Sequence, residues 1–177
     1  MRVIAGSHRG ARLAAPRGRD VRPTSDRVRE SLFSILGSVE GLNVLDLFAG
    51  SGALAIEALS RGAAQATLVE VSESAIASIR ANLARLELTA VVRRGDALMF
   101  LERARARAPQ YDLVFVDPPY RHAGVLGGLL SASLPPILAD DAKVVTESDR
   151  RAPLELDLPL LDERRYGDTL IRIYGSR

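Results

Sequence analysis

The fold is decided by the stretch Val44-Leu45-Asp46-Leu47-Phe48-Ala49-Gly50-Ser51-Gly52. Its first residues form a short apolar run that predicts a buried strand, and residues 53–59, which follow it, have the composition of a strong helix. The small residues in between predict a tight strand-to-helix turn. Because glycine has no side chain, Gly50 and Gly52 allow a ligand to approach the backbone of this turn closely.

Strands and helices alternate along the chain after this unit. Strands are expected at 43–47, 66–71, 89–93, 111–116 and 142–146, and helices at 52–60, 73–86, 97–107 and 122–133. Such alternation predicts an α/β domain with a doubly wound, mainly parallel sheet and helices on both faces. Two further strands, at 160–165 and 169–174, flank Tyr166-Gly167-Asp168. They predict a C-terminal antiparallel hairpin that brings the sheet to seven strands.

The N-terminal residues differ from the rest of the chain. Residues 2–5 and 11–14 predict a small β-hairpin, and a helix is expected to begin near Ser25 or Asp26. We therefore divide the chain into a basic hairpin arm, residues 1–20, and an α/β domain, residues 21–177.

Charge is distributed unevenly between these two parts. The whole chain carries +2, but residues 1–30 contain eight arginines and three acids, a net +5, which leaves −3 for the other 147 residues. A basic arm on a mildly acidic body predicts a nucleic-acid partner rather than a small neutral metabolite. We expect four arginines of the arm to contact it: Arg9, Arg12, Arg17 and Arg19.

The composition limits which kinds of binding site and which cellular locations are expected. The chain has no cysteine, which excludes disulfides and thiolate metal sites and is compatible with the cytoplasm. Its two histidines, His8 and His122, lie far apart without the spacing of metal ligands, so no metal site is expected. No apolar run approaches the length that spans a bilayer, and the first residues show no signal-peptide pattern. We expect a cytoplasmic monomer that does not bind a membrane.

The glycine turn carries an acid where a dinucleotide-binding turn would carry its first glycine. A carboxylate at Asp46 disfavours a pyrophosphate and favours a ligand with an ammonium group. S-adenosylmethionine has an ammonium group and no phosphate. We therefore expect this cofactor to be bound by Asp46 and by the turn residues Ala49, Gly50 and Gly52.

Acids after the next two strands fit the same ligand. Glu70 lies 24 residues after Asp46, the spacing of the acid that accepts ribose hydroxyls in nucleotide-binding α/β units. Asp96, followed by Ala97, comes after the third strand, where its carboxylate can accept from an adenine amino group and can also cap the helix that begins there. We count all three residues among those expected to bind the cofactor.

A second motif, Asp117-Pro118-Pro119-Tyr120, follows the strand at 111–116 directly. Prolines cannot continue a central strand, so the chain must leave the sheet at its carboxyl edge, where open α/β sheets bind ligands. Asp117 and the Pro118 carbonyl form a pair of acceptors beside the ring of Tyr120. This combination suits a flat heterocycle with an exocyclic NH2 group, and we expect these three residues to be catalytic.

A longer segment carries a family resemblance. Residues 22–33, Arg-Pro-Thr-Ser-Asp-Arg-Val-Arg-Glu-Ser-Leu-Phe, resemble the R-P-T-x-D-R-V-R-E-x-L-F signature of the bacterial small-subunit ribosomal RNA guanine-N2 methyltransferases, a class I methyltransferase family. The segments 1–6, 9–13 and 166–171 are also similar to that family. The resemblance implies methylation of guanine 966 in 16S rRNA, on an assembling 30S subunit. It also draws attention to Arg22 and Thr24, which either contact the target RNA or cofactor or simply lead into the helix.

Three other functions share parts of these patterns. A DNA adenine-N6 methyltransferase uses the same tetrapeptide but normally needs a target-recognition domain. A protein-glutamine methyltransferase has a similar layout with asparagine in place of Asp117. A non-catalytic RNA-binding module would keep the basic arm but would not need Asp46, Glu70 and Asp117 together.

Overall fold

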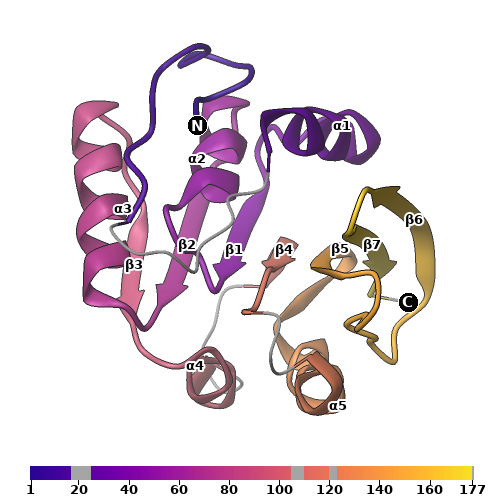
Figure 1. Cartoon of the computed structure of the whole chain (residues 1–177). Coiled ribbons are helices and arrows are strands. Elements are labelled where there is room, and N and C mark those ends of the chain that lie inside the picture. The colour runs from indigo at the N-terminus through magenta and orange to yellow at the C-terminus, as the bar shows by residue number, and fades with distance from the viewer. Residues whose placement is uncertain (17–24, 105–109, 120–122, 177) are drawn as a thin grey trace.

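The computed structural model describes residues 1–16, 25–104, 110–119 and 123–176, arranged as Figure 1 shows. The helical elements are α1 (Asp26–Leu36), α2 (Ala53–Ser60), α3 (Glu73–Arg85), α4 (Ala97–Ala104), α5 (Ala123–Ser133) and the 3₁₀ turn η2 (Pro135–Ile137). The strands are β1 (Asn43–Leu47), β2 (Gln65–Glu70), β3 (Val91–Arg94), β4 (Tyr111–Val116), β5 (Leu138–Asp149), β6 (Leu160–Tyr166) and β7 (Thr169–Gly175). Within the described ranges, no helix is both long and apolar enough to cross a membrane.

The seven strands form one sheet in the order β3-β2-β1-β4-β5-β7-β6. Strands β1 to β5 run parallel, and β7 is antiparallel to both of its neighbours, β5 and β6. This arrangement confirms the predicted fold. The chain proceeds outward in opposite directions from β1 and from β4, so the point where the strand order reverses lies between these two strands. Doubly wound sheets bind ligands at the carboxyl edge of such a point.

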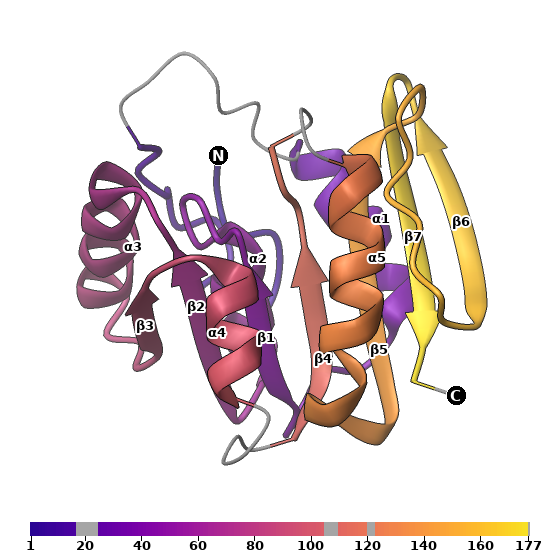
Figure 2. The same ribbon diagram turned by 90° about the horizontal axis from the view of Figure 1, so that it is seen from below.

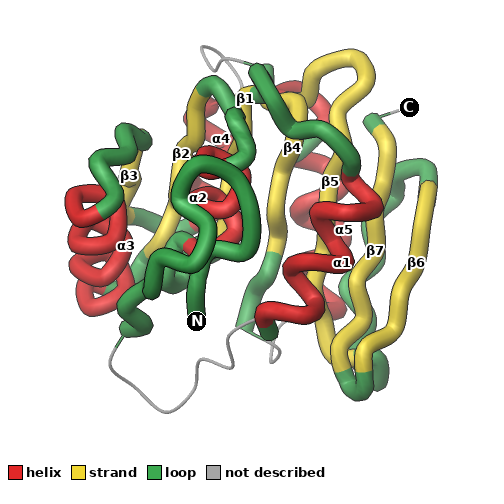
Figure 3. The backbone as a smooth tube through the Cα atoms, turned by 90° about the horizontal axis from the view of Figure 1, so that it is seen from above, coloured by secondary structure: helices red, strands yellow, loops and turns green. Residues whose placement is uncertain are grey.

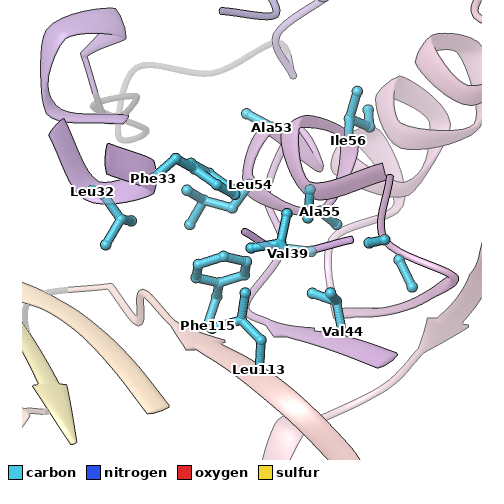
Figure 4. Packing of buried hydrophobic residues seen from close by; sticks show 14 of the residues in the cluster. Leu32, Phe33, Val39, Val44, Ala53, Leu54, Ala55, Ile56, Leu113 and Phe115 are labelled. Atoms are coloured by element: carbon cyan, nitrogen blue, oxygen red, sulfur yellow. The ribbon is translucent and has the colours of Figure 1, made fainter. Parts of the chain in front are cut away.

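Apolar side chains of the central strands alternate between two cores, one on each face of the sheet. Val44 and Phe115 belong to the core beneath α1, α2 and α3, whereas Leu45 and Val114 belong to the core beneath α4 and α5. Figure 2 shows α4 and α5 across the second face. In the first core the rings of Phe33 and Phe115 join α1 to β4, with their centroids 5.8 Å apart (Figure 4).

Most predicted elements differ from the observed ones by only a few residues, with larger differences at β5 and in the N-terminal hairpin. Strand β5 spans Leu138–Asp149, well beyond the expected 142–146. Helix α4 is described as far as Ala104, and the remaining expected residues, 105–107, lie outside the described part of the chain. The N-terminal hairpin contains one isolated antiparallel bridge, between Arg2 and Arg12, in place of two strands. The ladder stops there because the next backbone donors turn to a side chain of α2.

That side chain is Glu57, which is fully buried and anchors the arm to α2. Its carboxylate accepts hydrogen bonds from the backbone N–H groups of Ile4 (2.7 Å) and Ala5 (3.0 Å). Val3 and Leu13 of the arm are buried in the same core as α1, α2 and α3, and Figure 3 shows the N-terminal segment lying over α2. The division of the chain near residue 20 falls on residues 17–24, which are outside the described ranges, and stays a prediction.

Candidate active site at the carboxyl edge of the sheet

The turn between β1 and α2 has an unusual backbone conformation. Three of its residues have positive φ angles: Phe48 (63°), Gly50 (55°) and Gly52 (77°). For Phe48 this costs about 1–3 kcal/mol, a strain that clusters at ligand-binding sites. At Gly52 an added Cβ would lie 3.0 Å from Leu68 Cδ2, so the position also requires a residue without a side chain. The turn therefore presents backbone rather than side chains at the carboxyl edge of the sheet.

Asp46 is buried directly beneath this turn. Asp46 is 2% exposed, and its Oδ2 accepts the backbone N–H of Ala55 at 3.2 Å. Burial raises the pKa of Asp46 to about 7; the Ala55 hydrogen bond opposes this shift, and the charge of Glu70 adds to it. Among the described residues Asp46 forms no ion pair. A cationic ligand at this point would supply the missing compensation.

Glu70, at the end of β2, ties the turn to the neighbouring strand. Its Oε2 accepts the N–H of Gly50 at 2.8 Å, and its Oε1 accepts the N–H groups of Val71 and Ser72, both at 2.8 Å. A carboxylate offers about four acceptor positions. Glu70 can therefore hold the glycine turn in place and still accept a hydroxyl group.

Asp96 and Ala97 follow β3 at the same edge. Asp96 is exposed, and its Oδ1 accepts the N–H groups of Leu98 (2.9 Å) and Met99 (3.1 Å), so it caps helix α4. Ala97 is buried in the core under α4. The predicted capping role of Asp96 is confirmed, and its proposed contact with adenine stays a prediction.

The second motif begins where β4 ends. Asp117 is half-buried and Pro118 is buried. Desolvation raises the pKa of Asp117 well above its usual range, and the charges of Glu147 and Asp46 raise it further. Tyr120 lies outside the described residues.

The acids of these strands point to one side of the sheet. Successive side chains of a strand alternate between faces, and residues two apart share a face. Asp46, Glu70, Asp117 and Glu147 follow by two positions Val44, Leu68, Phe115 and Val145, all members of the core beneath α1, α2 and α3. The four carboxylates therefore extend from four adjacent parallel strands toward the same face.

Glu147 was missed by sequence reasoning. It is 5% exposed and lies within β5, one residue beyond Thr146, which pairs with Val116 of β4. The expected strand ended at 146, which left Glu147 as an ordinary residue after a strand. Its two-residue spacing from Val145 was the signal that would have placed it beside Asp117.

The expected RNA-binding arginines are only partly within the described chain. Arg9 and Arg12, which we call the arm arginines, are exposed, and no described acid pairs with them. The arm turns at the far end of α2, where the Ser7 N–H donates to the Ser60 carbonyl at 2.8 Å. Since α2 has eight residues, Arg9 lies on the order of 12 Å along this helix from the glycine turn. The other residues expected to bind RNA are outside the described ranges: Arg17, Arg19, Arg22 and Thr24.

The described part of the chain contains no group of three or more His, Cys, Asp or Glu side chains able to hold a metal ion. A surface hollow of about 430 Å³ lies away from the carboxylates, at the start of β4 and β5, where Leu36, Asp112 and Lys143 contribute to its lining. Its position at the amino edge of the sheet separates it from the candidate site.

Comparison with known proteins places this architecture in a family. The profile of the family described as Conserved hypothetical protein 95 matches residues 1–175. The chain belongs to this family. Ribosomal RNA small subunit methyltransferase D of Escherichia coli is 41% identical over 156 residues, covering 84% of this chain and 75% of that protein. The protein of the same name from Haemophilus influenzae is 32% identical over 182 residues, covering 99% and 94%.

A solved structure has the same fold. The hypothetical protein TTHA0928 of Thermus thermophilus matches with a TM-score of 0.85 and 31% identity, over 98% of each chain. Together these similarities confirm the resemblance to the small-subunit ribosomal RNA methyltransferases that the segment 22–33 indicated.

Proposed function

We propose that this protein is an S-adenosylmethionine-dependent methyltransferase that acts on 16S ribosomal RNA, with the exocyclic N2 of a guanine, guanine 966, as its target. The observation that carries the proposal is the meeting of Asp46, Glu70 and Asp117 on one face of three adjacent parallel strands, beside a glycine turn. The names of the relatives support ribosomal RNA as the substrate. The guanine position comes from the family resemblance.

The cofactor is proposed to lie across the glycine turn. Asp46 would attract its amino-acid ammonium group, which compensates a carboxylate that is otherwise buried without a cation. The backbone of Ala49, Gly50 and Gly52 would contact the same part of the ligand. Glu70 would accept a ribose hydroxyl, and Asp96 with Ala97 would contact the adenine at the end of the adjacent strand.

Methyl transfer is proposed to be a direct displacement at the sulfonium methyl group. The nitrogen lone pair of a guanine amino group is delocalised into the ring, so positioning contributes more than a strong base does. Asp117 and the Pro118 carbonyl would accept the two N–H bonds and direct the lone pair toward the methyl carbon, with Tyr120 stacked on the base. Asp117 must be ionised to stabilise the positive charge that develops on the nitrogen. The proton leaves after transfer.

The RNA is proposed to reach this pocket along the N-terminal arm. The arm arginines lie beside α2 with no described acidic partner, so their charge is available to phosphates. Arg17, Arg19, Arg22 and Thr24 would continue this contact toward the cofactor. A base in folded RNA must be splayed out of its stack to enter such a pocket. We further propose that the protein acts as a cytoplasmic monomer on an assembling 30S subunit.

The test uses small-subunit RNA and 30S particles from cells that lack the gene. Each is incubated with the purified protein and cofactor carrying an isotopically labelled methyl group, and nuclease fragments are sequenced by mass spectrometry. We expect one labelled N2-methylguanine, at guanine 966, with 30S particles as the better substrate. Asp117→Ala should abolish transfer and leave cofactor affinity unchanged within about twofold, because the lost interaction belongs to the transition state. Label on an adenine or a protein, or no label at all, would overturn the proposal.

A further inference from the structure

The buried side chain of Asn82 connects the glycine turn to the N-terminal arm, in addition to the contact of Ser51 Oγ with Met1 Sδ at 3.7 Å. Asn82 lies on α3 and is fully buried. Its Nδ2 donates to the carbonyl of Ser51 in the turn at 3.1 Å and to the carbonyl of Ala14 in the arm at 3.0 Å. Its Oδ1 accepts the backbone N–H of Ala14 at 2.8 Å. One amide group therefore holds both segments, which are 37 positions apart in the sequence.

The amide of Asn82 matches the hydrogen-bonding groups that the two segments present. Asn82 uses both donors of its Nδ2, and its Oδ1 also accepts from Arg85 at 3.4 Å, so its hydrogen-bonding capacity is filled. An aspartate would place an oxygen against two carbonyl oxygens, and a leucine would leave the buried Ser51 carbonyl without this donor and would remove both hydrogen bonds of Ala14. Either change costs more than the loss of one hydrogen bond on the surface.

Most other contacts between the arm and the domain are made by α2, while Arg29 of α1 holds the Arg2 carbonyl and Ser51 of the turn contacts Met1. Ser60 binds the arm at its tip, where its Oγ accepts the His8 N–H at 3.0 Å and donates to the Ala5 carbonyl at 2.6 Å. Ala14 is exposed, so its two hydrogen bonds with Asn82 are the main interactions that hold it in place. Ala14 also precedes Arg22 by only eight residues. The contact therefore sits between the cofactor turn and the segment that leads to the RNA-binding residues.

We propose that Asn82 is a positioning residue that couples cofactor binding to RNA binding. When the cofactor orders the glycine turn, Asn82 fixes the end of the arm, and RNA binds more tightly. Bound RNA, in turn, strengthens cofactor binding through the same contact. This inference rests on the proposed function. Coupling between two ligands is reciprocal, so each should strengthen the other by the same factor, and about fivefold is the lower end of the usual range.

The coupling can be read in the unaltered protein by amide hydrogen exchange. Saturation with S-adenosylhomocysteine should slow exchange of the Ala14 N–H several-fold, because that group is bound to Asn82. The Ser7 N–H, held by the Ser60 carbonyl at 2.8 Å, is the internal control and should not change. Unchanged exchange at Ala14 in a protein shown by calorimetry to bind the ligand would overturn the inference. Failure to bind the ligand at all would instead count against the proposed function.

A second test measures the coupling between cofactor and RNA binding in variants of Asn82 and Ser60. In Asn82→Leu, cofactor affinity measured with and without saturating RNA should be equal, so that the coupling factor falls to about one. Ser60→Ala is the matched control: it loosens the tip of the arm and should weaken RNA binding, but it should keep the coupling factor of the wild type. If Asn82→Leu does not fold, Asn82→Ser supplies the same measurement. A wild-type coupling factor in either Asn82 variant would overturn the inference.

Discussion

Binding of S-adenosylmethionine should release a proton from Asp46. Burial raises the pKa of this carboxyl to about 7, so in the free protein it is largely protonated below neutral pH. The cofactor's ammonium group favours the ionised form and should bring the pKa down by several units. The α-amino group itself has an ordinary pKa of about 7.7–8.0 and stays protonated at pH 6 to 7. Proton release in this range therefore reports on Asp46.

The size of the effect follows from the pKa. With a free-state pKa of about 7, cofactor binding should release about 0.9 proton at pH 6 and about 0.5 at pH 7. The same protonation equilibrium makes the cofactor dissociation constant about fivefold larger at pH 6 than at pH 7. Calorimetric titrations in two buffers that differ in ionisation enthalpy measure the proton release directly.

The control is Asp46→Asn, which keeps the acceptor for the Ala55 N–H but has no proton to lose. It should bind the cofactor more weakly, by about 1–3 kcal/mol, with no pH dependence from this site. The reasoning would be refuted if wild-type protein released no proton at pH 6, or if the asparagine variant released as much as the wild type.

The stability of the free protein should also depend on the protonation of Asp46. Its pH dependence should be opposite to that of cofactor binding. The folded-state pKa of Asp46 lies above the unfolded value of 3.8, so the folded state binds the proton more tightly. Its contribution to stability is complete below pH 3.8 and is lost as the pH rises through about 7. A shift of this size corresponds to a loss on the order of 4 kcal/mol. Denaturant titrations of wild type and Asp46→Asn between pH 4 and 8 measure it by difference.

Three further predictions concern other parts of the molecule. Glu147→Gln removes a charge that raises the pKa of Asp117, so the acid limb of the pH–rate profile should move to lower pH; a limb that moves to higher pH would contradict this. Gly6→Ala should destabilise the protein more than Gly10→Ala, since both have φ of 84° but only at Gly6 does a Cβ meet a backbone oxygen, at 1.7 Å. Thermal unfolding should show this as a larger fall in Tm, by about 2–4 °C per kcal/mol. Replacing both arm arginines by alanine should reduce the slope of log RNA affinity against log salt by about 0.7–0.9 per lost phosphate contact, whereas replacing two exposed arginines of β6 should not.

The sequence was sufficient for features that depend on neighbouring residues. The apolar run of β1, the glycine turn and the α2 pattern are contiguous, so their geometry is set locally. Asp46 and Asp117 could be brought together because parallel strands align their carboxyl ends, and the register confirms that β1 and β4 are neighbours. The face toward which the acids point was not predicted and follows from the core that contains the residues two positions before them.

What could not be predicted depends on contacts between distant segments. Glu147 was missed because the expected strand ended at residue 146, whereas β5 extends to Asp149. The buried carboxylate of Glu57 reads as one polar residue within a helix, and nothing nearby in the sequence indicates that it accepts N–H groups of Ile4 and Ala5. Nothing near Asn82 in the sequence indicates its hydrogen-bond partners either, since they lie 31 and 68 positions away.

The family signature in residues 22–33 also has a structural component that the sequence could not separate from RNA binding. Arg29, within that signature, is fully buried, and its Nη2 donates to the Arg2 carbonyl and to Asp26 Oδ1. A buried guanidinium cannot contact phosphate, so this arginine holds the start of the arm against α1. The charge of Glu57 faces it from α2. Part of the signature therefore serves to fix the arm to the domain, and the positive charge available to RNA is smaller than the count of arginines suggests. It resides on the exposed side chains, which among the described residues include the arm arginines and Arg27.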